Sequence, residues 1–347
     1  MATVYDVARV AGVSTATVSR VLRGSDLVHR DTRERVLAVM ETLDFVPNAT
    51  AQGLTLRRKD IIGLVALDRG TDEMDVERSS LLFTDQIVHA AEAVLRGTES
   101  SLLLTFGNRG EQLERRVRVL SGKVDGLLIA EEIMPPEKLR LLARRIPVVV
   151  VAGSRDETSM DVVLGDNTAG MAALAAHLTE HHRYSRLCLV AGPKNAPDAT
   201  ERRTAFERTV LAAPGCVLEP VIEGDFSEGS GVAAARAILS RGPLPQVVAC
   251  ANDQMAIGVL LEFQRAGVRV PADVALTGYD DIFPSRVVDP PLTTVSQPLR
   301  DLGSRAARRL LARIDDRNLR PRAEVLPTRT VIRVSCGCPP HDHLLRH

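Results

Sequence analysis

The first part of the chain carries apolar residues at helical spacing. Three short stretches, 4–11, 15–22 and 31–43, each place them along one side of a helix. Gly12 interrupts the first stretch, as a tight turn requires, and Ser14 is a residue type that caps helix N-termini. The pattern therefore predicts three short helices with a tight turn between the first two.

From Ile61 onward, short apolar runs alternate with amphipathic stretches. The expected strands are 61–67, 102–105, 126–130, 147–151, 186–191, 246–251 and 274–278. The expected helices are 85–96, 111–120, 136–144, 168–180, 200–211, 229–240 and 254–266. Strands that alternate with helices are typical of parallel sheets covered on both faces. About 275 residues exceed one small sheet, so we expect two doubly wound α/β lobes with a ligand cleft at the strand ends.

Composition narrows the class of protein. The 347 residues are 45% hydrophobic and 25% charged, which is ordinary for a soluble protein. We find no apolar run of about 18 residues and no basic segment followed by an apolar core at the N-terminus. We therefore expect a cytoplasmic protein. Net charge is zero, but residues 1–59 hold nine Arg or Lys against six Asp or Glu, the sign that DNA binding requires.

The second predicted helix has chemistry suited to DNA. A seam of small apolar residues can join the helices: Val7, Ala8, Val13, Val18 and Val21. The residues left to point outward are Thr15, Ala16, Thr17, Ser19 and Arg20. Hydroxyls suit phosphate oxygens, arginine suits guanine, and methyl groups suit thymine. This spacing fits a helix-turn-helix in the major groove, but an ordinary helical hairpin with solvated Ser and Thr fits it too.

Residues 3–59 resemble the DNA-binding headpiece of the lactose-repressor/galactose-repressor (LacI/GalR) family. The matching motifs are Tyr5-Asp6-Val7-Ala8, Ala11-Gly12-Val13-Ser14, Thr17-Val18-Ser19-Arg20-Val21, Thr32-Arg33 and Pro47-Asn48-Ala49. The resemblance implies that Thr15, Ala16 and Arg20 read bases. It implies that a second set holds the DNA backbone or nearby edges: Tyr5, Ser14, Thr17, Ser19 and Asn48. Thr15 and Ala16 stand where the family varies with its operator, so the operator sequence cannot be read from them.

Residues 49–56, which follow Pro47-Asn48, are too few to form a stable helix alone. In the family it is a hinge helix that folds on DNA, and Leu54 stands where a leucine wedges into the minor groove. A flexible linker is the alternative. The expected domains are a headpiece at 1–47, a hinge at 48–59, a core at 60–335 and a flexible tail at 336–347.

The resemblance extends over the rest of the chain. Its landmarks include Val124-Asp125-Gly126-Leu127-Leu128-Ile129, Asp166-Asn167, Ala191-Gly192-Pro193, Asn252-Asp253 and Gly278-Tyr279-Asp280-Asp281. They imply a periplasmic-binding-protein-like core with an effector in its cleft. The implied effector contacts are Arg202, Phe226 and Asp253, with Lys194, Asp198 and Phe83 as further contacts. Without the family, Arg202 could be a surface residue, Phe226 a core residue and Asp253 a helix cap.

The residue types of this site suit a sugar. An aromatic face, a fork of donors and a carboxylate together match a polyol ring. Ala152-Gly153, however, offers no acidic residue where sugar sensors of the family usually carry one. A modified sugar, a nucleoside or no ligand at all therefore stay open.

Other chemistry is less well supported. We find no phosphate-binding glycine loop and no serine nucleophile elbow, so an enzyme is disfavoured and no cofactor is expected. A transport-type binding protein is disfavoured by the headpiece and the missing signal peptide. The pair His181-His182 lacks a partner cluster, so we expect it in an exposed turn.

The cysteines do not suggest a disulfide framework. The five are odd in number and mostly far apart. Cys336-Gly337-Cys338 with His341 and His343 could form a metal site. A disordered, reduced tail is favoured instead, because the segment is short and lacks the usual two-residue gap between paired ligands.

The sequence therefore predicts a DNA-binding transcriptional regulator, most simply a repressor, controlled by a small effector. A homodimer would place two headpieces on a palindromic operator. The end of the chain carries no leucine heptad, so the tetramer-forming helix of some relatives is not expected.

Overall fold

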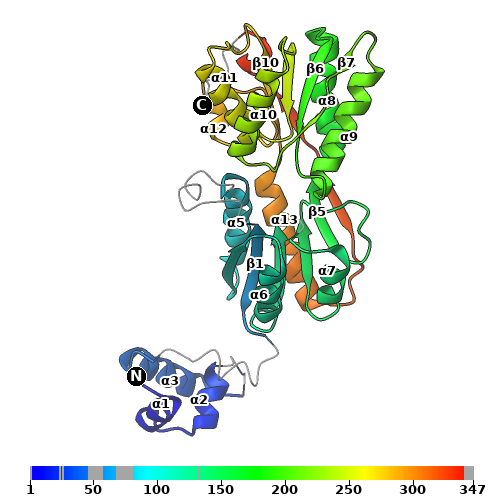
Figure 1. The fold of residues 1–347 in the computed structure, drawn as a ribbon. Coiled ribbons are helices and arrows are strands. Elements are labelled where there is room, and N and C mark those ends of the chain that lie inside the picture. The colour runs from blue at the N-terminus through cyan, green and yellow to red at the C-terminus, as the bar shows by residue number, and fades with distance from the viewer. Residues whose placement is uncertain are drawn as a thin grey trace. The chain divides into compact units, whose positions relative to one another are not determined.

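The computed structural model describes residues 2–22, 25, 27–45, 58–67, 81–130 and 133–339, with Leu81 and Leu82 by backbone alone. The chain forms two compact units, residues 1–59 and residues 60–347 (Figure 1). Two residues with predicted DNA contacts, Asn48 and Leu54, lie outside the described residues.

Within the residues that the structure describes, the first unit contains three helices: α1 (Val4–Ala11), α2 (Thr15–Leu22) and α3 (Arg30–Thr42). Helix α1 begins with a capping box, in which the Asp6 amide donates to Thr3 Oγ1 at 3.3 Å and the Thr3 amide donates to Asp6 Oδ2 at 3.0 Å. It ends at Gly12, whose φ of 65° lies in the left-handed region. The expected bounds of the first two helices are confirmed, and the third begins and ends one residue earlier than expected.

The seam between these helices is confirmed. Val7, Val18 and Val36 are fully buried, one from each helix, and Val13 is partly buried against the same cluster. The small side chains let three short helices approach closely enough to bury a common core. This packing, rather than the propensity of any one helix, stabilises so short a unit.

The first lobe of the second unit is built on a six-stranded parallel sheet in the order β12-β5-β4-β3-β1-β2. The strands are β1 (Ile61–Leu67), β2 (Ser101–Gly107), β3 (Gly126–Ala130), β4 (Val148–Val151), β5 (Asp161–Gly165) and β12 (Ala323–Leu326). Helices α5 (Leu81–Leu95) and α13 (Leu299–Asp315) bury one face of the sheet. Helices α6 (Glu111–Ser121) and α7 (Pro136–Ala143) bury the other.

The second lobe holds a parallel sheet in the order β10-β9-β6-β7, with β8 also paired to β6. Its strands are β6 (Arg186–Ala191), β7 (Val217–Leu218), β8 (Ile222–Glu223), β9 (Val247–Cys250) and β10 (Ala275–Thr277). Helices α10 (Glu228–Ser240) and α11 (Asp253–Arg265) cover one face. Helices α8 (Asn167–Ala176) and α9 (Pro197–Ala212) cover the other. The short helix α12 (Pro284–Val287) and the antiparallel pair β11 (Thr294–Ser296) and β13 (Arg329–Val331) complete the lobe.

The chain passes between the lobes three times, from β5 to α8, from β11 to α13 and from β12 to β13. Each lobe is therefore assembled from pieces that are distant in the sequence. Asp161, fully buried at the start of β5, shows how they are joined. Its carboxylate accepts from Arg309 Nε at 2.7 Å and also pairs with Arg313, both from α13.

The sequence located seven strands and seven helices of this unit, and missed others. Among the missed elements are the long helix α13 and the strands β5, β11, β12 and β13. One further expectation needs correction: the chain does not become a flexible tail at residue 336. Cys336 is fully buried at the end of the 3-10 helix η2 (Val334–Cys336), and Cys338 is 6% exposed.

Close contact between α10 and α11 yields a test of the second lobe. A Cβ atom at Gly258 would lie 2.1 Å from the backbone carbonyl oxygen of Glu228, and backbone cannot move aside as a flexible side chain can. We predict that Gly258→Ala lowers the free energy of unfolding by about 1–3 kcal/mol or more. Gly97→Ala is the matched control, because the nearest atom to its new Cβ would be 3.9 Å away. Equal urea unfolding midpoints for the two variants would contradict this account of the packing.

Candidate functional site

Arg202 is the centre of a buried polar cluster in the second lobe. It lies on α9 and is 2% exposed. Its Nε donates to Asn167 Oδ1 at 2.9 Å, and its Nη1 donates to the carbonyl oxygen of Ala251 at 2.8 Å. Asn167 begins α8 and Ala251 follows β9, so one guanidinium joins three elements of the lobe.

Two carboxylates balance this buried charge. Asp198 Oδ2 lies 3.5 Å from Arg202 Nη2, and Asp280 Oδ1 lies 3.5 Å from Arg202 Nη1. Burial by itself disfavours the charged guanidinium, but Asp280 and Asp198 outweigh it and raise the pKa of Arg202 above its usual value. The arginine therefore stays charged in the interior of the lobe.

Aromatic rings cover the same guanidinium. Its central carbon lies 3.9 Å from the ring centroid of Tyr279 and 5.8 Å from that of Phe226. Phe226 has a φ of 72°, a conformation that bulky residues rarely adopt. A Cβ at Gly192 would lie 2.4 Å from the Phe226 ring, so the glycine after β6 makes room for it. A strained aromatic held beside a charged group is typical of a functional site.

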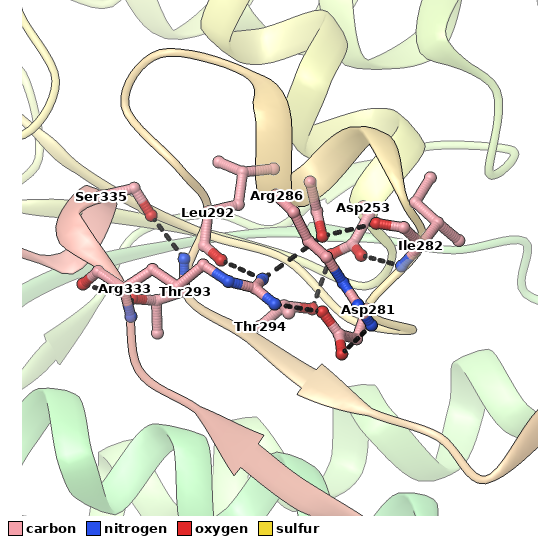
Figure 2. Close-up of polar contacts among 10 residues, drawn as sticks. Asp253, Asp281, Ile282, Arg286, Leu292, Thr293, Thr294, Arg333 and Ser335 are labelled. Atoms are coloured by element: carbon pink, nitrogen blue, oxygen red, sulfur yellow. Dashed lines mark hydrogen bonds and ion pairs between the residues drawn. The ribbon is translucent and has the colours of Figure 1, made fainter. Parts of the chain in front are cut away.

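Asp253 lies deeper, at the start of α11, and is fully buried. Its Oδ2 accepts from the Ile282 amide at 2.9 Å and its Oδ1 accepts from the Thr294 hydroxyl at 2.6 Å (Figure 2). Both carboxylate oxygens are thus engaged by the protein. Burial, with Asp280 nearby, raises the pKa of Asp253 well above its usual range. Asp253 holds the loop that carries Asp280, and a direct bond to a ligand would compete with these contacts.

Asp280 is the site residue that the sequence reasoning missed. It lies in the motif Gly278-Tyr279-Asp280-Asp281 after β10, has a φ of 109°, and accepts from Gln297 Nε2 at 2.7 Å. The sequence carries a signal for it, because a polar residue shortly after a parallel strand lies at the ligand-binding edge of the sheet. The sequence motif marks this position only as a family landmark, whereas the resemblance points to Asp253 as the acidic ligand contact.

The other predicted contacts are more scattered. Lys194 is 76% exposed and lies 3.6 Å from Glu223 Oε1. Phe83, on α5, packs partly buried against the core of the first lobe. The structure thus brings together Arg202, Asp198 and Phe226, while Lys194 lies at the surface and Phe83 belongs to the other lobe.

The cluster is connected to the first lobe through ion pairs. Arg155, in the loop between β4 and β5, donates to Glu201 Oε1 at 2.8 Å and to Asp166 Oδ1 at 3.2 Å. Glu201 in turn accepts from Asn167 Nδ2 at 3.1 Å, and Asn167 accepts from Arg202. A movement of either lobe would therefore reach the Arg202 cluster through polar contacts.

The C-terminal segment supports the loop that follows β10. Arg333 pairs with Asp281 and donates to the Leu292 carbonyl at 2.7 Å (Figure 2). Ser335 Oγ accepts from the Thr293 amide at 2.8 Å and donates to the Leu276 carbonyl at 2.6 Å. The far end of the chain thus fixes the backbone on both sides of Tyr279 and Asp280.

In the first unit, α2 presents its predicted base-reading residues outward. Thr15, Ala16 and Arg20 are exposed, and Tyr5 on α1 is 76% exposed. Ser14 Oγ accepts from the Thr17 amide at 3.1 Å, as a helix cap does. Thr17 and Ser19 are half-buried. The outward surface of α2 is therefore polar and available for contact.

Comparison with known proteins matches both units. Residues 3–48 match the family model described as "Bacterial regulatory proteins, lacI family", and residues 175–336 match "Periplasmic binding protein-like domain". The HTH-type transcriptional repressor PurR of Photobacterium profundum is 32% identical over 340 residues, covering 96% of this chain and 98% of the relative. The ribose operon repressor of Haemophilus influenzae is 31% identical over 341 residues, with the same coverage of both chains.

Solved structures agree with the observed fold. The transcriptional regulator CelR–cellobiose complex is 32% identical with a TM-score of 0.71, covering 96% of this chain and all of its own. The Lac repressor dimer bound to operator and the anti-inducer ONPF is 28% identical with a TM-score of 0.83, covering 96% and 99%. The α/β architecture expected from the sequence is confirmed. No helix within the described residues is long and apolar enough to span a membrane.

The raised pKa of Asp253 predicts a pH dependence. Above the ordinary carboxyl pKa, Asp253 keeps its proton in the folded chain and loses it in the unfolded chain. The contribution of Asp253 to the free energy of unfolding therefore declines as pH rises above that range. We predict that Asp253→Asn flattens this decline between about pH 5 and pH 8. Urea unfolding at several pH values measures it.

The matched control is Asp273→Asn. A hydrogen bond from Arg269 holds the pKa of Asp273 at about 2, so this carboxyl titrates below the measured range. Its replacement should leave the pH profile parallel to that of the unaltered chain. A parallel profile for Asp253→Asn as well would contradict the prediction.

Proposed function

This chain belongs to the lacI family of bacterial regulatory proteins and is a ligand-controlled, DNA-binding transcriptional regulator; we propose that it represses its target and that its effector is a sugar. The observation that carries the sugar proposal is the charged Arg202, buried among carboxylates and aromatic rings. We propose Arg202, Asp198, Asp280 and Phe226 as its principal contacts.

The chemistry of these groups favours a polyol. Sugar hydroxyls can donate to the carboxylates of Asp198 and Asp280 and accept from Arg202 in the same plane. The apolar face of a pyranose ring can stack on Phe226. The regulator CelR, similar to this chain over almost its whole length, is solved with cellobiose. A modified sugar or a nucleoside offers comparable hydroxyls and is the alternative ligand class.

We propose that Asp253, Lys194 and Phe83 take lesser parts. Asp253 would act through the loop it holds, since its oxygens bind Ile282 and Thr294. Lys194 would approach the ligand from the exposed loop after β6. Phe83 would contribute an apolar contact from the first lobe.

At the DNA end, we propose that Thr15, Ala16 and Arg20 read bases in the major groove. The proposed backbone contacts are Tyr5, Ser14, Thr17, Ser19 and Asn48, with Leu54 of the hinge segment 48–59 inserted in the minor groove. A homodimer on a palindromic operator would use two such headpieces, as in the Lac repressor dimer bound to operator. Such a regulator would act in the cytoplasm, on the nucleoid, without catalytic activity of its own.

The two activities would be coupled through the lobes. We propose that ligand binding at Arg202 shifts the pairing of Arg155 with Glu201 and Asp166, and with it the angle between the lobes. That shift would alter the spacing of the two hinges and hence operator affinity. Such coupling is a free-energy difference between two states of the dimer.

Substitution on α2 tests the DNA proposal. Arg20→Ala should weaken binding to the specific operator by about 5- to 150-fold, because a bidentate arginine–guanine contact contributes about 1–3 kcal/mol of discrimination. Arg30→Ala on α3 is the charge-matched control, since Arg30 is exposed and pairs with Glu34 at 2.9 Å. Fluorescence anisotropy on specific and random duplexes measures both. If both variants lost the same affinity for both duplexes, Arg20 would contribute only its charge and the prediction of base reading would be wrong.

A ligand screen tests the effector proposal. Thermal shift with a panel of sugars and nucleosides should show stabilisation by at least one sugar, and Phe226→Leu should weaken it about tenfold or more by removing the aromatic face. Arg202→Met should abolish binding, and Arg236→Met should not, because Arg236 lies exposed on α10 and pairs with Glu262. Stabilisation by nucleosides alone would reject the sugar assignment. Unchanged sugar affinity in Phe226→Leu would reject the site.

A further inference from the structure

Two histidines and two cysteines meet on the second lobe, away from the Arg202 cluster. They are His177 and His182, at the end of α8, and Cys336 and Cys338, at the far end of the described chain. The ligand atoms of all four lie within 4.8 Å of one another. We propose that these four residues form a structural zinc site.

The local backbone brings the histidines together. Helix α8 continues into a π-helical turn, His177–His181, and the His182 amide donates to the His177 carbonyl at 3.2 Å. A π turn places residues five apart in register, and such turns occur often at functional positions. The rings of His177 and His182 accordingly lie 4.8 Å apart between centroids, edge to face. The sequence predicts an exposed turn without a partner cluster for His181-His182; His181 is exposed, but the prediction is wrong for His182, which is half-buried and lies 3.3 Å from Cys338 Sγ.

The cysteines are turned toward the histidines by Gly337. Its φ of 96° is a conformation favourable only to glycine, and a Cβ there would lie 2.9 Å from the Tyr184 hydroxyl. That hydroxyl donates to the Cys336 carbonyl at 2.9 Å, while the Tyr184 ring stacks on His182 with centroids 5.1 Å apart. One tyrosine therefore positions a residue from each half of the site, as supporting residues of metal sites do.

Three sulfur–nitrogen separations are close to those of tetrahedral zinc. Bond lengths of about 2.3 Å to sulfur and about 2.0–2.1 Å to nitrogen give a sulfur–nitrogen separation of about 3.6 Å at the tetrahedral angle. The structure has 3.7 Å from His177 Nε2 to each of the two sulfurs, and 3.3 Å from His182 Nε2 to Cys338 Sγ. A cation at the centre would require only small side-chain adjustments.

The donor set favours zinc over other abundant divalent cations. Thiolate and imidazole select zinc, whereas calcium and magnesium prefer oxygen ligands. Four protein ligands close the coordination sphere, so the site is structural rather than catalytic. Binding would replace the thiol protons of Cys336 and Cys338, which pass to solvent, and both histidines would bind as neutral imidazoles.

The site would fasten the end of the chain to the lobe. Cys336 directly follows Ser335, and Arg333 just before them binds Asp281 and the Leu292 carbonyl. Zinc would thus hold in place the segment that supports the loop carrying Asp280. This inference does not rest on the proposed effector, because the metal site stands apart from Arg202. The sequence alternative, with His341 and His343 as ligands, lies outside the described residues.

Metal analysis of the full-length, tag-free protein tests the proposal. The protein, expressed in zinc-supplemented medium and then purified, should hold about one zinc per chain. Inductively coupled plasma mass spectrometry measures this zinc content. Cys338→Ser and His182→Gln should each reduce zinc content severalfold. Two matched controls should retain it: Cys216→Ser, a cysteine outside the cluster, and His181→Gln, the exposed neighbour of His182. Equal zinc content in His182→Gln and His181→Gln would overturn the assignment.

The absorption spectrum of the unaltered protein with Co²⁺ in place of zinc is a readout that does not depend on the folding of any variant. The unaltered protein, stripped of metal and given Co²⁺, should show intense tetrahedral d–d absorption and a sulfur-to-cobalt charge-transfer band. Chelation of zinc should lower its thermal midpoint by several degrees, and should not change that of Cys338→Ser. The proposal would be overturned if the protein purified without metal and gave no cobalt spectrum. It would also be overturned if the intact mass were two hydrogens below that of the reduced chain, as a Cys336–Cys338 disulfide would make it.

Discussion

The buried charge of Arg202 is the constraint around which the sensing lobe is organised. An arginine 2% exposed is tolerable only where its charge and donors are satisfied. Asn167, Ala251, Asp198 and Asp280 supply those partners from four separate segments. Because the segments are α8, α9 and the loops after β9 and β10, the guanidinium fixes where the strand ends of the lobe converge.

The same constraint explains the residues behind the site. Asp280 can face Arg202 only if its loop is held, and Asp253 holds that loop from within while Arg333 holds it from the chain end. Asn167 and Glu201 extend the network to Arg155 in the first lobe. A ligand that competes for Arg202 would therefore disturb contacts on both sides of the crossovers. In the proposed mechanism, this network is the route by which ligand binding would reach the hinge segment 48–59.

Local patterns predicted much of this structure. Helices α1 and α2 and strands β1, β3 and β6 fall at their expected bounds, because apolar periodicity and caps are local properties. Helix α13 was missed because its many arginines hide the apolar side that it buries against the first sheet. Strand β12 was missed because it is mostly exposed and because its partner, β5, is distant in the sequence. Ala323 of β12 pairs with Val162 of β5, 161 residues earlier. Such pairings arise from topology, which periodicity does not encode.

The site residues divide in the same way. Arg202 and Phe226 could be predicted from their positions in family motifs. The ion pair of Arg202 with Asp280 could not, because it forms only when α9 and the loop after β10 meet in the folded lobe. The sequence predicts a flexible tail at Cys336 and Cys338 because their partners lie 156 to 161 residues away. Spacing rules find ligands that are close in sequence, and neither cluster is of that kind.

Reciprocal linkage tests the central claim most directly. If the site at Arg202 controls the headpiece, then saturating operator DNA must change the affinity for the effector sugar by the factor by which that sugar changes operator affinity. Calorimetric titration of the sugar, with and without operator, measures it. The account predicts equal factors of about 5- to 150-fold, as is typical of allosteric coupling. An effector affinity that is the same with and without operator would contradict it.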